Sequence, residues 1–315
     1  MAEYKGIHGT KVQDYTTDPD NPLTGQVWYN ETANTLKYFY NNPGAWATGG
    51  VLNTARRLLA GAGTQTAALA FGGGPPFTAI TESYNGTSWT EVNDLNTARR
   101  QLAGAGTNTA ALGFGGYNPT LPVSPIANTE SWNGTNWTEV NDLNTARSRL
   151  AGAGIQTAAL AFGGDPSTAV TETWNGTNWT EVNDLNTARR ELAGAGTNTA
   201  ALAFGASPSL ALTESWNGTN WTEVNDLNTG RGALGGVGVD NTSALAFGGE
   251  GPAVTGATES WNGTNWTEVA DLGTARYALA GAGIQTAALA FGGQPSGTLT
   301  EEWNSGPATV TITTD

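Results

Sequence analysis

The chain has 315 residues, a length that favours a repeat array or a large β architecture for a single domain. Its 44 glycines and single methionine, together with many threonines and asparagines, indicate strands and tight turns, so we expect almost no helix. The absence of cysteine excludes disulfides, thiolate metal sites and cysteine nucleophiles, and the single histidine, His8, argues against a Ser-His-Asp triad or a multi-histidine metal centre. A net charge of −14 argues against nucleic acid or an anionic membrane as a partner.

The first 45 residues do not fit the pattern of the rest of the chain. They begin without the apolar region of a secretion signal, and no apolar run anywhere approaches the length that spans a bilayer, so we expect a soluble protein. The stretch from Gln26 to Tyr40 predicts a β-hairpin, in which "QVWYN" and "TLKYFY" are strands joined by "ETAN". Residues 1–45 are therefore expected to form an N-terminal extension.

The text from Gly25 to Trp46, "GQVWYN…LKYFY…W", is similar to short modules near the start of many tail-fibre and other virion proteins of bacteriophages. This resemblance implies a location in the virion. It also implies that the hairpin adjoins an attachment segment at Met1 to Asn21, with other virion proteins as partners. It carries over no catalytic residue.

From Trp46 onward the chain is a repeat. The motif "FGG", or a close variant, recurs every 42 to 48 residues, which is the spacing of one propeller blade. One copy contains the four strand candidates "SRLAGAG", "TAALAFGG", "TETWN" and "WTEV", separated by turn signals. The small residues of "LAGAG" suit an innermost strand, and in the next strand Leu160 and Phe162 alternate with Ala159 and Ala161. We therefore expect the large face of one blade to pack on the small face of the next.

These features together resemble the kelch motif: a hydrophobic strand ending in Gly-Gly, then Trp174, Trp179 and Arg189 in order. The resemblance covers Trp46 to Trp303, although Trp174 and Trp179 are only five residues apart, a tighter turn than kelch proteins usually have. It implies a β-propeller and no single function. The predicted fold is an all-β, six-bladed β-propeller of four-stranded kelch-like blades over residues 46–304.

Two segments compete for the fourth strand of the last blade. Trp46 lies six residues before Leu52, as Trp89 lies six before Leu95, so an N-terminal strand is expected to close the ring. The tail, residues 305–315, also alternates. We place Ala308 to Thr313 as an extra outer strand or a contact with a partner.

Charged residues and tryptophans recur once per blade. We interpret the arginines and glutamates as structural pairs rather than as a ligand-binding ring. The tryptophans, such as Trp132 and Trp137, are interpreted as packing residues rather than as a sugar-stacking array. The "NGT" sequons are interpreted as hairpin turns rather than as glycosylation sites. Calcium held by acids such as Glu139 and Asp142 stays an open alternative; no other cofactor or metal is expected. The recurring arginines are Arg56, Arg99, Arg147, Arg189, Arg231 and Arg276, and the glutamates are Glu82, Glu130, Glu172, Glu214, Glu259 and Glu301.

The loops between second and third strands differ from copy to copy while the strands are nearly identical. All six are expected on one face, which predicts a recognition surface on a rigid support. The expected function is non-enzymatic binding of a host-surface glycan or protein by a phage tail fibre, spike or appendage, with an oligomer possible. The alternatives are a structural capsid or tail protein, a cellular kelch-type adaptor and a glycan hydrolase, because two carboxylates suffice for hydrolysis. The candidate binding residues are Pro76, Phe77, Tyr117, Asn118, Pro119, Leu121, Asp165, Ser209, Glu250 and Gln294.

Overall fold

A computed structural model describes residues 12–122 and 124–312 of the chain; these residues form 26 β-strands and no helix, and so none that could cross a membrane. His8 lies outside the described residues. The chain divides into two units. One combines the residues up to Gly44 with those from Asn304 onward, and the other is Ala45–Trp303.

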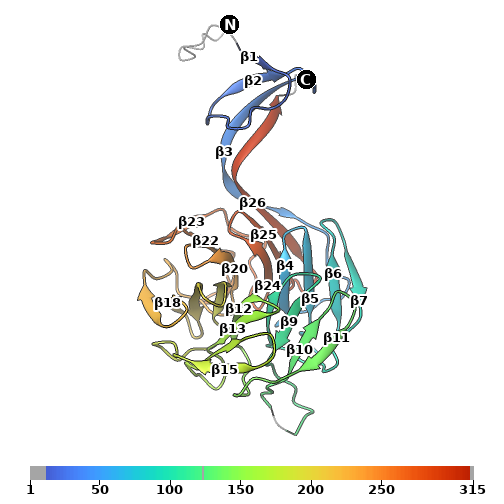
Figure 1. Cartoon of the computed structure of the whole chain (residues 1–315), viewed down its shortest axis with the longest axis vertical. Coiled ribbons are helices and arrows are strands. Elements are labelled where there is room, and N and C mark those ends of the chain that lie inside the picture. Colours follow the sequence, from blue (N-terminus) through green and yellow to red (C-terminus); the bar gives the residue numbers. More distant parts are fainter. Residues whose placement is uncertain (1–11, 123, 313–315) are drawn as a thin grey trace. The chain divides into compact units, whose positions relative to one another are not determined.

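The second unit is a ring of six antiparallel four-stranded sheets, or blades (Figure 1). The first strands of the blades contact one another in order, from β4 through β24 and back to β4. The predicted all-β six-bladed propeller is therefore confirmed. Blade 1 consists of β4 (Ala60–Thr64), β5 (Ala67–Phe71), β6 (Thr81–Tyr84) and β7 (Trp89–Val92), and blade 2 of β8 (Ala103–Gly106), β9 (Ala111–Phe114), β10 (Thr129–Trp132) and β11 (Trp137–Val140). Blade 3 consists of β12 (Ala151–Ile155), β13 (Ala158–Phe162), β14 (Thr171–Trp174) and β15 (Trp179–Val182), and blade 4 of β16 (Ala193–Gly196), β17 (Ala201–Ala206), β18 (Leu210–Trp216) and β19 (Trp221–Val224). Blade 5 consists of β20 (Gly235–Asp240), β21 (Ser243–Phe247), β22 (Thr258–Trp261) and β23 (Trp266–Val269), and blade 6 of β24 (Ala280–Ile284), β25 (Ala287–Phe291), β26 (Thr300–Ile312) and β3 (Thr35–Thr48).

Blade 6 is completed by β3, the strand that carries Trp46, so the predicted closure by an N-terminal strand is confirmed. Each fourth-strand tryptophan donates its indole N–H to a threonine hydroxyl of the preceding blade, and Trp46 does so to Thr258 at 3.1 Å, as Trp266 does to Thr213. The expectation of a separate outer strand in the tail was wrong. The tail up to Ile312 is the continuation of β26, which pairs with β3. The tail and the segment around Trp46 therefore belong to neighbouring strands and do not compete for one place. Thr313 lies outside the described residues.

The core lies between blades, as the alternating pattern predicted. Leu160 and Phe162 of blade 3 pack with Ala201 and Ala203 of blade 4 in one buried cluster. Glycine in the innermost strand makes this close approach possible. A β-carbon on Gly104 would lie 2.7 Å from the backbone oxygen of Gly61 and equally close to the Phe71 ring. The same contact repeats around the ring, so each sheet is held chiefly by its neighbours.

The first unit contains β1 (Gln13–Tyr15), β2 (Val27–Asn30) and the beginning of β3. The β2–β3 pairing runs from Val27 opposite Tyr38 to Asn30 opposite Thr35, which is the predicted hairpin, and β1 adds to it in parallel. Asp18 binds across this sheet: one carboxylate oxygen accepts from Trp28 and Asn30, and the other from Lys37 at 2.7 Å. Chiefly the Lys37 hydrogen bond lowers the pKa of Asp18 to about 2.

Candidate functional site

The recurring arginines and glutamates are buried ion pairs inside single blades, which we call brackets. In blade 3, Arg147 Nη2 lies 2.9 Å from Glu172 Oε1, and Arg147 Nη1 donates to the backbone oxygens of Gly163 and Val170. Glu172 also accepts from the backbone and side-chain nitrogens of Asn144, at 2.7 and 2.8 Å. Burial lowers the pKa of Arg147, and the attraction of Glu172 opposes that shift. The structural interpretation of these charges is confirmed. The six brackets are Arg56–Glu82, Arg99–Glu130, Arg147–Glu172, Arg189–Glu214, Arg231–Glu259 and Arg276–Glu301.

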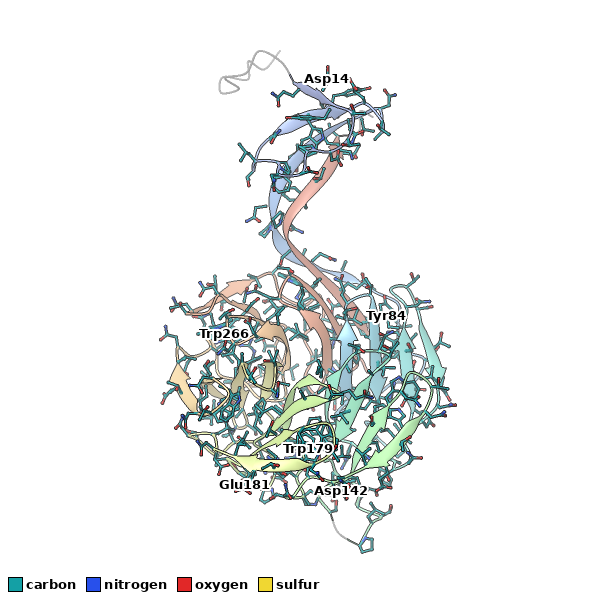
Figure 2. All side chains as sticks on the ribbon, in the orientation of Figure 1. Asp14, Tyr84, Asp142, Trp179, Glu181 and Trp266 are labelled. Atoms are coloured by element: carbon teal, nitrogen blue, oxygen red, sulfur yellow. The ribbon has the colours of Figure 1, made fainter. Side chains whose placement is uncertain are left out.

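The repeated tryptophans are also structural. The rings of Trp132 and Trp137 lie 5.4 Å apart and both are buried, so neither offers a face for stacking on a sugar. Trp179 and Trp266 occupy the same position in their own blades (Figure 2). The acids considered for calcium are not gathered into a site: within the described residues, no group of three or more Asp, Glu or His side chains is arranged to hold a metal ion.

Two adjacent positions per blade vary between copies, although the residues around them are nearly the same. They lie between the bracket arginine and the next leucine, in "TARRLL", "TARRQL", "TARSRL", "TARREL", "TGRGAL" and "TARYAL". We call the first the outer variable residue and the second the axial residue. The outer variable residues are Arg57, Arg100, Ser148, Arg190, Gly232 and Tyr277, and the axial residues are Leu58, Gln101, Arg149, Glu191, Ala233 and Ala278.

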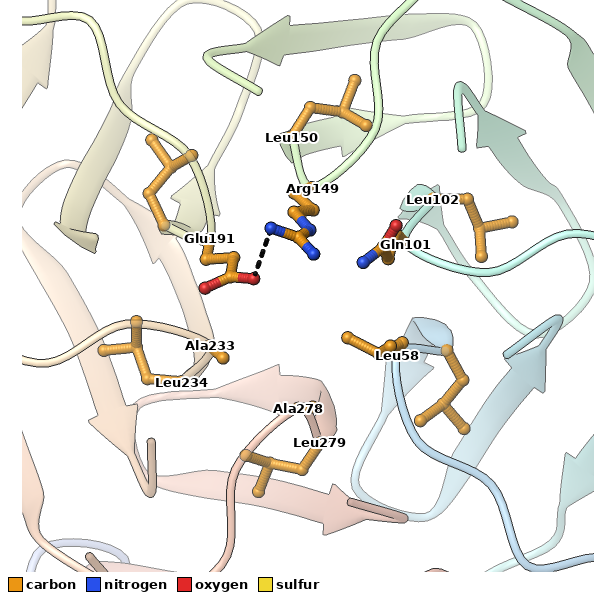
Figure 3. A pocket seen from close by; sticks show the side chains of 12 residues that line it. Leu58, Gln101, Leu102, Arg149, Leu150, Glu191, Ala233, Leu234, Ala278 and Leu279 are labelled. Atoms are coloured by element: carbon orange, nitrogen blue, oxygen red, sulfur yellow. Dashed lines mark ion pairs between the residues drawn. The ribbon is translucent and has the colours of Figure 1, made fainter. Parts of the chain in front are cut away.

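The axial residues form a closed ring of backbone hydrogen bonds. Each N–H donates to the carbonyl oxygen of the axial residue in the preceding blade, at 2.7 to 2.9 Å. All six have left-handed backbones, with φ between 50° and 60°, which costs free energy for any residue except glycine. None of the six is glycine. The ring therefore holds six side chains in a strained position, where they surround the propeller axis (Figure 3).

The predicted loops meet these residues on the same face. An isolated backbone bridge joins each outer variable residue to the start of the second-to-third loop in its own blade in five blades; in blade 4 a hydrogen bond from Ser207 N to Arg190 O does the same. Four of the predicted site residues, Tyr117, Asp165, Glu250 and Gln294, take part in such bridges. The loops and the two variable positions thus form one continuous surface, which we call the variable face.

The other predicted residues lie along the same loops with different exposure. Pro76, Pro119 and Leu121 are exposed, and Phe77 and Ser209 are half-buried. Asn118 is buried at 4 % exposure; its amide donates to Ala98 O at 2.7 Å and accepts from Thr120. Asn118 therefore shapes its loop, and its polar atoms are already used.

The centre of the variable face contains two small cavities on the axis. One of about 240 Å³ is lined by the axial residues of blades 1, 2, 3, 4 and 6 and by Arg57, Arg100 and Tyr277. The other, about 100 Å³, is lined by all six axial residues and the buried leucine that follows each of them (Figure 3). A larger cavity, about 370 Å³, lies where the loops of blades 6 and 1 meet and includes Arg57, Pro75 and Gln294.

The axial and outer variable residues were not identified from the sequence as part of this surface, because the loops alone were considered there. Its signal was present: the pair of letters between "TAR" and "L" changes in every copy, inside text that is otherwise repeated. Only the closed ring of six blades shows that these six pairs of residues lie close together in space.

Comparison with known proteins supports the fold and assigns no function. No protein-family model matches the chain, and no curated protein matches it. Solved structures that are similar number 448 chains. One of them, described as the structure of YjhT, has a TM-score of 0.65 and 12% sequence identity; the match covers 85% of this chain and 98% of that one. At this identity the likeness shows the β-propeller fold alone.

Proposed function

We propose that this chain is a non-enzymatic recognition protein of a bacteriophage virion, in a tail fibre, spike or other surface appendage. It binds a host-surface glycan or protein through the variable face. The observation that carries the proposal is where the blades differ. The brackets, the core and the turns of the opposite face are repeated, whereas the loops, the outer variable residues and the axial residues change. A rigid scaffold with changes gathered on one face is typical of binding proteins.

Two further observations support the details. The similarity of Gly25 to Trp46 to phage virion modules favours the virion location. In the 240 Å³ cavity, Glu191 is the one carboxylate of the lining, and it is paired with Arg149 at 3.2 Å. Glycoside hydrolysis uses two carboxylates flanking the bond, so this cavity favours binding over hydrolysis.

Adhesion of the purified chain to host cells tests the proposal. Replacing Pro119 to Ser124 with a short Gly/Ser turn should weaken adhesion without lowering the melting temperature, because Asn118 and the buried Ile126 remain in place. Ile155→Ser, a change at the exposed last residue of β12, is the control and should leave adhesion unchanged.

Three kinds of result would contradict the proposal. Equal adhesion by the loop variant and the intact chain, or no adhesion by either, would favour a purely structural protein. Absence of the chain from purified virions, measured with an antibody, would favour a cellular adaptor instead. Release of reducing ends from host polysaccharide would identify an enzyme.

A further inference from the structure

The arginines outside the brackets are confined to one place. Ten arginines occur in the chain, and six of them are bracket residues. The other four are Arg57, Arg100, Arg149 and Arg190, and every one is an axial or an outer variable residue. In a chain with a net charge of −14, the guanidinium groups outside the brackets therefore all lie on the variable face.

Two of these four arginines are already neutralised. Arg149 lies 3.2 Å from Glu191, and Arg190 lies 2.5 Å from Asp165. Within residues 12–122 and 124–312, Arg57 and Arg100 have no carboxylate oxygen within 4.0 Å. These two guanidinium groups line the 240 Å³ cavity together with Arg149.

Neutral aromatic groups hold the two unpaired arginines. Arg57 Nη1 donates to the Tyr277 hydroxyl at 3.4 Å, and the Arg100 guanidinium carbon lies 5.5 Å from the centre of the Tyr117 ring. Both side chains are half-buried, so their charges are partly removed from water without a counter-charge. Such an arrangement favours a bound anion, because the anion supplies the missing charge to groups that are already oriented.

The rest of the cavity lining limits what the anion is attached to. Leu58 and Ala278 are apolar, Tyr277 offers an aromatic ring with a hydroxyl, and the carboxylate of Glu191 is paired with Arg149. The volume is below the roughly 300 to 1,000 Å³ typical of drug-sized ligands, so one sugar unit or one terminal group fits better than an oligosaccharide.

We propose that Arg57 and Arg100 bind a single carboxylate or phosphate group of an acidic surface polysaccharide at the centre of the variable face. The proposal rests on the proposed function and deepens it by naming the ligand class. The loops of the variable face contact the sugar units around that charged group.

Titration calorimetry of the full chain tests this with three polymers: a polysaccharide that contains glucuronate, poly(glycerol phosphate), and neutral dextran. We expect binding to at least one acidic polymer, weakened by salt, and none to dextran. The acidic polymer that binds identifies carboxylate or phosphate as the preferred anion.

Single variants then locate the binding. Arg57→Gln and Arg100→Gln should each weaken binding about tenfold or more, as expected for loss of a charge-assisted hydrogen bond. Arg100→Lys should retain part of the affinity because the charge stays. Lys37→Gln is the charge-matched control: it removes one positive charge from the first unit, where Lys37 pairs with Asp18, and binding should change less than about threefold.

The melting temperatures of the variants are compared first, so that loss of binding is not loss of folding. Equal binding of dextran and the acidic polymers, or an equal loss with Lys37→Gln, would overturn the proposal. Adhesion to host cells that survives the double variant R57Q/R100Q would overturn it while leaving the proposed function intact. Arginine-dependent polymer binding without adhesion to any host cell would support anion binding at this cavity and contradict the proposed function.

Discussion

At the scale of single residues, the chain depends most on groups that it repeats. Glu172 holds Arg147, Asn144 and Thr145 at once, so it fixes the segment that enters blade 3 to the third strand of that blade. A buried ion pair is weak support for stability as a whole, but removing one half leaves an uncompensated buried charge. This explains why the arginine that ends "TAR" or "TGR" and the glutamate of "TE" recur in every blade.

Glu172→Gln should lower the free energy of unfolding by about 3 kcal/mol or more, because Arg147 keeps its charge and loses the carboxylate. Urea unfolding followed by tryptophan fluorescence measures this change. Glu181→Gln, at an exposed glutamate of the same blade (Figure 2), is the control and should change stability by less than about 0.5 kcal/mol. Equal losses in the two variants would show that the bracket is dispensable.

At the scale of elements, the junction of blades 6 and 1 differs from the other five. Tyr84 stands where blades 2 to 6 have tryptophan, and its hydroxyl donates to Glu302 of β26 at 2.5 Å. Gly50 lies beside it, and a β-carbon there would be 2.0 Å from the backbone oxygen of Thr87. The ring is thus completed by residues particular to this junction, while β3 supplies the missing fourth strand.

Deleting residues 1–48 should lower the melting temperature by at least about 5 °C, because blade 6 loses its fourth strand and the inter-blade bond of Trp46, a loss of several kcal/mol. Deleting residues 1–34 is the matched control, since it removes β1 and β2 and keeps β3. Differential scanning calorimetry compares them. A melting temperature that is the same for both deletions would contradict closure by β3.

The same junction predicts a response to alkaline pH. Burial, and then the hydrogen bond to Glu302, raise the pKa of Tyr84 from 10.0 to about 12. The stability that Tyr84 contributes is therefore complete below pH 10 and is lost as the pH rises toward 12. Ultraviolet titration of the intact chain should contain one late tyrosine step that Tyr84→Phe removes. If the titration curves of the two proteins differ only by a tyrosine with an ordinary pKa, the hydrogen bond to Glu302 is not formed in solution.

At the scale of the whole propeller, the two faces differ in how much their residues vary from blade to blade. The turns "NGTN" close their hairpins in the same way in blade after blade: Asn175 accepts from the backbone of Thr177 and Asn178, as Asn217 does from Thr219 and Asn220. On the variable face the six residues that meet at the axis are of five different types, and only Ala233 and Ala278 are alike. One ring can therefore present a new surface without a change in its core, because the strained axial positions are held by backbone bonds that do not depend on the side chain.

The sequence by itself determined the strands, the number of blades and the strand that closes the ring. Period-2 alternation such as Leu160 and Phe162 against Ala159 and Ala161, the Asn-Gly turns and the position of Trp46 are local signals, and each was sufficient for its element. The recurrence of arginine and glutamate once per blade also led to their interpretation as structural pairs. Only the tertiary structure decided that Leu58, Gln101, Arg149 and Glu191 are neighbours, that Asn118 is used inside its loop, and that the tail continues β26. The physical reason is that the axial residues are more than 40 residues apart along the chain. They are brought together only by the packing of all six blades into a closed ring, which no single repeat encodes.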